Sequence, residues 1–336
     1  MKKRILEVNA KILCAASVVG HKEHEGPLGE KFDIFDGTDS FKQKTWEKAE
    51  SRMQTLALSE ALRKAKLYEE EIDALFAGDL LNQCTGSAYG LVDFDIPYFG
   101  LYGACSTAIE GIILSSLLIS GRHCKKCAAV TSSHFCTAEQ QYRTPLEYGG
   151  QRAPTAQWTV TGSGAFILGT ESDIGVRVTK AMPGIVIDKG INDAANMGAA
   201  MSPAALDTLV SFFKESRTRP EDYGGIYTGD LGMEGSSILR EFMKIEGYEL
   251  GNNYEDCGTI IFNIEEQDVH SGGSGCGCSA VVLASHILPR LRSGEIKSAI
   301  IVGTGAMMSP SSLKQGQSIP AIAHLILLES EEKQWI

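Results

Sequence analysis

The chain has 336 residues, of which 43% are hydrophobic and 22% charged, a balance that excludes a disordered or fibrous protein. This length exceeds what one small core needs and predicts two packed halves, which we place at residues 1–170 and 171–336. The formal net charge of -11 argues against nucleic-acid binding, because phosphate recognition needs a basic surface.

The cysteines and the N-terminus limit the cell compartment. Nine cysteines, several of them in glycine-rich runs such as 275–278, make a poor disulfide framework and indicate free thiols in a reducing compartment. Cys124 and Cys127 form a CxxC without a second CxxC or a histidine pair, so no metal site is predicted.

Glu7 and Asn9 interrupt the apolar stretch behind the basic start, so we expect no signal peptide. No apolar run approaches the ~20 residues of a spanning helix, and any membrane association is expected to be peripheral.

Short, largely apolar strands are predicted along the chain, as expected when helices cover both faces of a sheet. The first covers residues 11–20. Thr45 is predicted to cap a helix over residues 46–60, where apolar residues recur at helical spacing. A strand at 73–77 then leads into Gly78-Asp79-Leu80.

The second half repeats this order. A helix is predicted over Ser202–Glu215, with Ser202 as N-cap and Pro203 at the first helical position. A strand at 225–228 leads into Gly229-Asp230-Leu231. Each half then has a Gly/Cys/Ser-rich turn that opens a helix of small residues, a glycine near the helix end, and a further strand: 103–108, Gly121 and 127–131; 275–280, Gly294 and 299–303. The same succession twice predicts an internal duplication.

Residues 134–157 break the symmetry. They are polar and interrupted by glycine and proline. Connections of this length are usually functional, so we expect a lid or an interface loop. A strand over 158–168 follows and closes the first half.

Cys105 is the sharpest chemical feature of the sequence. It follows a strand-like segment at 96–102 and opens a long apolar helix. The unpaired N–H groups and positive potential of a helix start favour a thiolate, which a nucleophilic cysteine needs. A small buried core residue is the alternative, and the position alone does not decide between them.

The duplicated order, the turn at 103–107 and the late glycine-rich turn resemble the thiolase and β-ketoacyl synthase superfamily. More narrowly, TSSHFCTAE at 131–139, QWTVTG at 157–162 and GGSGCGCSA at 272–280 resemble the family of stage V sporulation protein AD. The resemblance spans nearly the whole chain. It implies an α/β thiolase fold, with two pseudo-duplicated βαβαβαββ halves in five α-β-α-β-α layers.

The sequence departs from the enzymes of that superfamily, where the cysteine works with a base and oxyanion donors. The resemblance aligns Ser274 with the histidine or asparagine of a glycine-rich turn. The strand end where such enzymes carry histidine or asparagine reads Thr228-Gly229-Asp230, and no cysteine precedes Gly303. Acyl transfer is therefore expected to be lost. His134 and His270 are the remaining candidates for a base, or are satisfied core or surface histidines.

The resemblance also implies a ligand and partners. The ligand is dipicolinic acid, alone or as its calcium chelate, so no cofactor is expected beyond calcium carried by the ligand. The partners that it implies are other stage V sporulation A membrane proteins at the inner membrane of the forespore or spore. The roles that it implies are uptake of dipicolinic acid into the developing spore and spore germination. A homodimer is the default for thiolase-type proteins.

A flat dianion needs cationic or N–H donors, and a guanidinium suits a carboxylate well. Arg143 and Arg152 lie in the long loop with Gln157 nearby, although either arginine could be a solvated charge or a dimer contact. The candidate ligand-binding residues are Cys105, His134, Arg143, Arg152, Gln157, His270 and Ser274.

Three functions remain open at this point. The first, which we favour, is a binding module that has kept the cavity of the fold. The second is an acyltransferase that uses Cys105 and requires a base within hydrogen-bond reach of the sulfur. The third is a structural subunit with a vestigial pocket.

Overall fold

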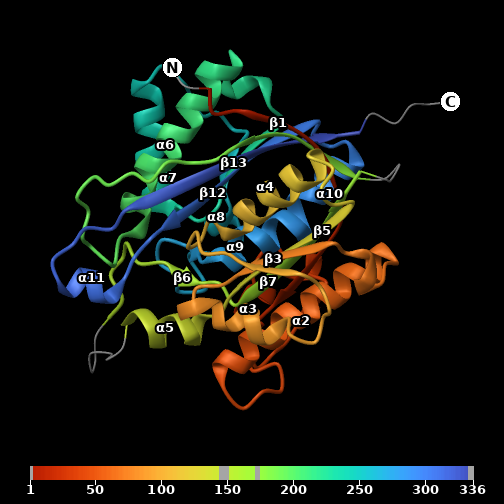
Figure 1. Cartoon of the computed structure of the whole chain (residues 1–336). Coiled ribbons are helices and arrows are strands. Elements are labelled where there is room, and N and C mark those ends of the chain that lie inside the picture. The colour runs from red at the N-terminus through yellow and green to blue at the C-terminus, as the bar shows by residue number, and fades with distance from the viewer. Residues whose placement is uncertain (1–2, 144–150, 171–174, 332–336) are drawn as a thin grey trace.

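The computed structural model describes residues 3–143, 151–170 and 175–331. Within these residues, eleven strands form one mixed sheet, and β11 and β6 form a separate parallel pair. Figure 1 shows the layers: α6 and α7 cover one side, α4 and α9 lie in the middle, and α2 and α3 cover the other side. The predicted five-layer arrangement is confirmed.

The elements of the first half follow in chain order. They are β1 (Leu6–Val19), α1 (His21–His24), β2 (Ile34–Phe35), α2 (Trp46–Ala65), β3 (Ala74–Gly78), α3 (Thr85–Gly90), β4 (Tyr98–Gly100), α4 (Thr107–Ser120), β5 (Lys126–Ser133), α5 (Phe135–Arg143), β6 (Trp158–Thr159) and β7 (Gly162–Gly169).

The second half follows a matching order. Its elements are β8 (Val176–Met182), α6 (Met197–Ser216), β9 (Gly225–Thr228), α7 (Gly232–Ile245), β10 (Tyr254–Asp256), α8 (Cys257–Ile260), β11 (Gly273–Ser274), α9 (Cys276–Val282), the π-helical turn η5 (Leu283–Ile287), α10 (Leu288–Ser293), β12 (Ser298–Ala306), α11 (Pro310–Lys314) and β13 (Ala321–Ser330).

The strand order makes the duplication explicit. It runs β10-β9-β12-β13-β8-β1-β7-β5-β3-β4, with β2 beside β1, so each half contributes one contiguous side of the sheet. The halves join where β1 pairs antiparallel with β8, for example Leu6 with Ala181. The predicted boundary between residues 170 and 171 stays a prediction, because residues 171–174 lie outside the described part of the chain.

Three apolar cores hold the layers together. The central core packs α4 and α9 between the strands of both halves and includes Ile112 and Val282. The outer cores place Met53 of α2 and Phe212 of α6 against opposite faces. Close approach in the centre explains the small residues: a Cβ on Gly164 of β7 would lie 2.7 Å from the Cβ of Ala280, far inside normal contact.

The predicted start of the helix at Ser202 is wrong. Helix α6 begins at Met197, and the Asn196 side chain caps it by accepting a hydrogen bond from the N–H of Ala199. Ser202 lies one turn inside, where its hydroxyl donates to the carbonyls of Gly198 and Gly235. The Ser-Pro pair imitates a helix start, but an asparagine cap upstream satisfies the first N–H groups instead.

The long connection at 134–157 is more regular than predicted. Helix α5 occupies Phe135–Arg143, and residues 144–150 lie outside the described part of the chain. The strand predicted at 158–168 is divided into β6, which pairs with β11, and β7, which pairs with β1 and β5. This division brings the cysteine-glycine turn of the second half beside the first half.

Candidate functional site

The Cys105 turn is held between the two halves. Ala104 takes a left-handed conformation with φ +50, and Ser106 then precedes α4 and donates its hydroxyl to the Gly103 carbonyl at 2.6 Å. A Cβ on Gly305 of β12 would lie 2.4 Å from the Gly103 carbonyl oxygen. Only glycine at 305 lets the strand pass directly against this turn.

A buried carboxylate network surrounds the cysteine. The Cys105 Sγ lies 3.9 Å from the Ser274 Oγ, and Ser274 donates to the Asp230 Oδ2 at 2.9 Å. The Gly275 N–H donates to the same oxygen at 3.0 Å, and the Thr304 hydroxyl donates to the Asp230 Oδ1 at 2.7 Å. The ends of β9, β11 and β12 thus meet at one carboxyl group.

The surroundings of the sulfur favour its protonated form. Burial, with the Asp230 carboxylate beside the thiol, raises the pKa of Cys105 well above its usual value. Burial also raises the pKa of Asp230, although the hydroxyls of Thr304 and Ser274 oppose that shift. The pKa of Cys105 is thus raised although the residue lies at a helix start, whose potential favours a thiolate.

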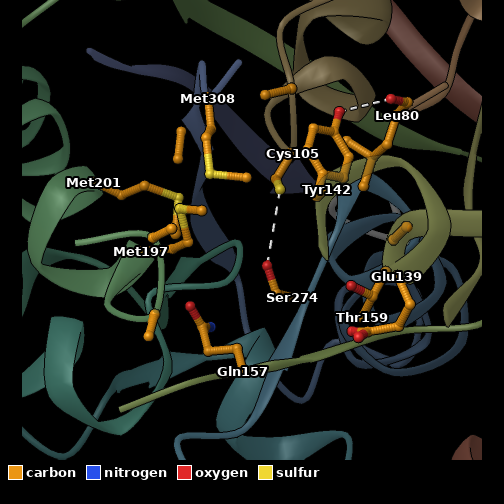
Figure 2. A pocket seen from close by; sticks show the side chains of 15 residues that line it. Leu80, Cys105, Glu139, Tyr142, Gln157, Thr159, Met197, Met201, Ser274 and Met308 are labelled. Atoms are coloured by element: carbon orange, nitrogen blue, oxygen red, sulfur yellow. Dashed lines mark hydrogen bonds between the residues drawn. The ribbon is translucent and has the colours of Figure 1, made fainter. Parts of the chain in front are cut away.

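Cys105 opens into a cavity of about 110 Å³. Figure 2 shows Met197, Met201 and Met308 on one side of the cavity, with Tyr142 on the other. The Tyr142 hydroxyl donates to the carbonyl of Leu80 at 2.7 Å. Among the described residues, Glu139 is the only charged side chain on the wall. The wall is therefore mainly apolar, with adaptable thioether groups.

The sequence matches one family over nearly its full length. The profile described as "Stage V sporulation protein AD (SpoVAD)" matches residues 2–329. Stage V sporulation protein AD of Bacillus subtilis (strain 168) is 44% identical over 316 residues, which cover 94% of this chain and 93% of that protein. The chain belongs to the stage V sporulation protein AD family. It is therefore a member of a family of sporulation proteins.

Solved structures show that this family member has a thiolase-type fold. An OleA variant from Xanthomonas campestris is similar with a TM-score of 0.62 at 13% identity, over 98% of this chain and all of that chain (100%). The 3-oxoacyl-[acyl-carrier-protein] synthase III from Aquifex aeolicus VF5 is similar with a TM-score of 0.58 at 13% identity, over 95% and 99% of the two chains. At this identity the likeness shows the fold alone.

Three of the predicted site residues meet at the cavity: Cys105, Gln157 and Ser274. The Gln157 Nε2 is already engaged, since it donates to the carbonyls of Asp230 and Gly273, each at 2.8 Å. Its Oε1 is buried and has no hydrogen-bond partner among the described residues. Gln157 therefore fixes the strand ends and offers one acceptor, whereas Ser274 connects the cavity to the carboxylate.

His134 does not line the cavity, although the sequence makes it a candidate base and ligand-binding residue. Its Nε2 lies 2.9 Å from the Asp39 carbonyl oxygen, its Nδ1 accepts from the Cys136 N–H, and its ring lies 5.4 Å from that of Trp46. Burial lowers the pKa of the ring. It is a satisfied core histidine, because the chain turns into α5 directly after β5 and directs the ring toward the start of α2.

His270 is also absent from the cavity wall. Its Nε2 lies 3.7 Å from the Asp268 carboxylate, and its backbone has φ +52. The residue belongs to the turn before β11, so Ser274 rather than His270 reaches the cysteine.

The two arginines do not form a described carboxylate fork at the cavity. The Arg152 Nη2 lies 2.9 Å from the Glu139 carboxylate, and the guanidinium lies over the rings of Phe135 and Trp158. Arg143 is the last residue of α5, and its side chain lies outside the described part of the structure. Arg152 therefore neutralises the acid of the wall from outside the cavity.

The sequence reasoning missed Asp230 and the methionines. It identifies Asp230 only as a position without a base, although the repeated Gly-Asp-Leu after β3 and β9 is a signal for a structural role at both strand ends. The methionines come from α6 and the segment after β12, and no local pattern indicates that these segments meet. Within residues 3–143, 151–170 and 175–331, no three metal-ligating side chains gather as a metal site.

No helix in the described chain is both long enough and apolar enough to span a membrane.

Proposed function

We propose that this family member is a non-catalytic binding protein of sporulation, which holds dipicolinic acid in the Cys105 cavity. The observation that carries the proposal is the Asp230 carboxylate beside the Cys105 thiol. Acyl transfer needs a thiolate and a group that accepts its proton, and a buried carboxylate opposes formation of the thiolate.

The neighbours of Asp230 strengthen the argument. Its two oxygens accept from Thr304, Ser274 and the Gly275 N–H, so the carboxylate has a complete set of structural donors. No histidine lines the cavity among the described residues. The polar route from the sulfur runs through Ser274 to Asp230, a carboxylate that already accepts three hydrogen bonds, and no imidazole on the described wall takes part.

The charge of the wall favours the calcium chelate of dipicolinic acid over the free dianion. The described wall offers no cationic side chain to a dianion, because its one charged residue is Glu139, an acid that pairs with Arg152 outside the cavity, and the carboxyl group of Asp230 lies behind Cys105. A one-to-one chelate with calcium has no net charge. Its flat ring suits the space between Tyr142 and the methionines, since thioethers make favourable contacts with aromatic rings.

Family membership also supports a proposal for the partners and the location. We assign the protein to uptake of dipicolinic acid into the developing spore and to germination, with other stage V sporulation A membrane proteins as partners. It would lie at the inner membrane of the forespore or spore, and association would be peripheral.

A homodimer is also proposed, through the edge of the sheet. Strand β4 is the outermost strand at one end of the order, and its residues Tyr98, Phe99 and Gly100 are exposed. An exposed edge strand with aromatic side chains is a template for pairing with another strand. Phe99→Asp should convert a dimer to a monomer in light scattering, whereas Tyr68→Asp, at another exposed aromatic, should not. A wild-type monomer would exclude the dimer.

Calorimetry with three ligands tests the binding proposal. We expect saturable binding of calcium dipicolinate, weaker binding of free dipicolinate, and no mass increase at Cys105 after incubation with acyl-CoA. An acyl adduct on Cys105 with turnover would establish the acyltransferase. Absence of binding by all three would favour the structural subunit.

A matched pair of variants locates the ligand. Ala194 lies on the cavity wall and is exposed, so Ala194→Trp should fill the cavity without disturbing the core. Lys189 is exposed in the same loop but does not line the cavity. Ala194→Trp should weaken binding tenfold or more, which corresponds to about 1.4 kcal/mol, while Lys189→Trp should leave it unchanged. Equal affinity in both would place the ligand elsewhere.

A further inference from the structure

A second hollow lies at the other end of β9. Asp230 follows the carboxyl end of this strand, whereas Gly224 precedes the strand and lines a hollow of about 620 Å³. Helix α10, which contributes Arg290 to the wall of this hollow, lies away from α5, β6 and α11, which lie near the cavity (Figure 1). The two sites are therefore separate.

A π-helical turn presents His286 to this hollow. The turn η5 spans Leu283–Ile287 between α9 and α10, and such single wide turns occur frequently at functional sites because they redirect one side chain. The His286 Nδ1 lies 3.0 Å from the Lys31 Nζ. Since an ammonium can only donate, Nδ1 accepts, and the neutral ring carries its proton on Nε2.

Charge is unequally distributed around the hollow. Arg290 has carboxylate partners: its Nε lies 2.7 Å from Glu295, and its Nη1 lies 3.6 Å from Glu255. The same Nη1 donates to the Tyr227 hydroxyl at 2.5 Å. Lys31, by contrast, has no carboxylate within 4.0 Å in the described chain, and its side chain is exposed. Glu295 and Glu255 both pair with the Arg290 guanidinium. The Lys31 ammonium lies instead beside the neutral imidazole of His286.

The surroundings of His286 favour its neutral form, mainly through burial and against the charge of Glu295. Burial, with the charges of Lys31 and Arg290, lowers the pKa of His286 to about 4. The imidazole is thus neutral at neutral pH, and the Lys31 side of the hollow is the side that lacks a counter-charge. Ammonium and N–H donors without an acid are suited to a carboxylate or phosphate group.

We propose that this hollow is a second ligand site, in which Lys31 and the Nε2–H of His286 bind a carboxylate or phosphate group of a small anion. Asn252 also lines the hollow and is exposed, which leaves its amide available to the same group. The site does not depend on the function proposed for the Cys105 cavity.

Titration of the full chain with inorganic phosphate and with succinate tests this proposal. Binding is followed by calorimetry and by the NMR resonances of the histidine rings. We expect saturable binding of at least one anion, with a shift of the His286 resonances, and competition between the two if both bind. Lys31→Met should weaken binding tenfold or more. The control Lys48→Met removes an exposed lysine from α2 and should change nothing.

Two outcomes would overturn the proposal: no saturable binding of either anion, or equal affinity in Lys31→Met and the wild type. The variant Ala194→Trp keeps the two proposals distinguishable. It should weaken dipicolinate binding in the Cys105 cavity tenfold or more without affecting the binding of phosphate. Dipicolinate that is displaced by phosphate and lost in Lys31→Met would support this second site and count against the cavity.

Discussion

The same three residues, Gly-Asp-Leu, end strand β3 in the first half and strand β9 in the second, yet their aspartates have different surroundings. Asp79 accepts hydrogen bonds from the N–H groups of Leu81 and Ser87 and from the Ser87 hydroxyl. It lies close to the buried carboxyl group of Glu50. Asp230 instead binds donors from two distant strands and faces Cys105.

The duplication thus preserved the Gly-Asp-Leu sequence at the strand end, whereas the two aspartates accept hydrogen bonds from different kinds of partner. Asp79 is satisfied mainly by residues that follow it directly in sequence, so it stabilises its own turn. Asp230 is satisfied by Ser274 and Thr304, 44 and 74 residues away, so it ties the second half together around the cysteine. The surroundings of Cys105 at the cavity thus depend on the hydrogen bonds that Asp230 accepts from these distant residues.

The largest effect on the free energy of unfolding is expected from the turn that contains Ser274 and Gly275, two of the donors to Asp230. Gly275 has φ +101, and a Cβ there would lie 2.5 Å from the Ser133 Oγ. In the first-half turn the left-handed conformation is taken by a residue with a side chain, Ala104, at φ +50. Gly275→Ala should therefore destabilise the protein by about 3 kcal/mol or more, because strain and a buried clash act together, as measured by denaturant unfolding.

Gly294 provides the matched control for this substitution. It has φ +78, but a Cβ added there would have nothing within 4 Å, so Gly294→Ala meets backbone strain alone. Its cost should be about 1 kcal/mol. Equal costs in the two variants would mean that the turn before α9 relaxes freely, and the contrast between the halves would lose its structural basis.

Much of the architecture could be predicted from the sequence. Thr45 does cap a long helix, α2, and the Gly/Cys/Ser-rich turns do open central helices, since caps and glycines act locally. The candidate site was harder to predict from the sequence. Cys105, Gln157 and Ser274 meet at the cavity, but the consequence for the thiol depends on Asp230, whose partners are distant in sequence. His134 satisfies its ring within the core, which no local pattern reveals.

A pH-dependent effect on stability comes next, from the first-half carboxyl groups. Burial, with the nearby charge of Asp79, raises the pKa of Glu50 to about 8, above the usual value near 4.5. The unfolded chain then releases this proton first, so stability is complete below about pH 4.5 and falls by about 1.4 kcal/mol per pH unit up to about pH 8. Burial also raises the pKa of Glu23 to about 8 and that of Asp256 to about 7, so Glu50→Gln should reduce the pH slope in denaturant unfolding by the Glu50 contribution and leave the rest. An unchanged slope would show that Glu50 is ionised in the fold.

The reactivity of Cys105 sharpens the comparison directly. Asp230→Asn removes the charge beside the thiol, so the pKa of Cys105 should fall and iodoacetamide should label it at least tenfold faster at pH 8, one pKa unit being about 1.4 kcal/mol. Asp79→Asn should leave the labelling of Cys105 unchanged. Mass spectrometry of the labelled peptide provides the rate. Equal labelling rates in the two variants would mean that both substitutions act by destabilising the fold. Asp230 would then have no specific effect on the pKa of Cys105.

The smallest effects concern the outer helices, where the two halves should behave alike. Thr45 caps α2 through the N–H of Lys48, and Asn196 caps α6 through the N–H of Ala199. Thr45→Ala and Asn196→Ala should each reduce the free energy of unfolding by about 1 kcal/mol, because each leaves one helix N–H without its side-chain acceptor. Gln317→Ala, at an exposed position, should change it by less than about 0.5 kcal/mol. A much larger loss at Asn196 than at Thr45 would extend the asymmetry of the halves to the outer layer. It would implicate Met197, which follows Asn196 and lines the cavity, because a frayed start of α6 would displace part of the cavity wall.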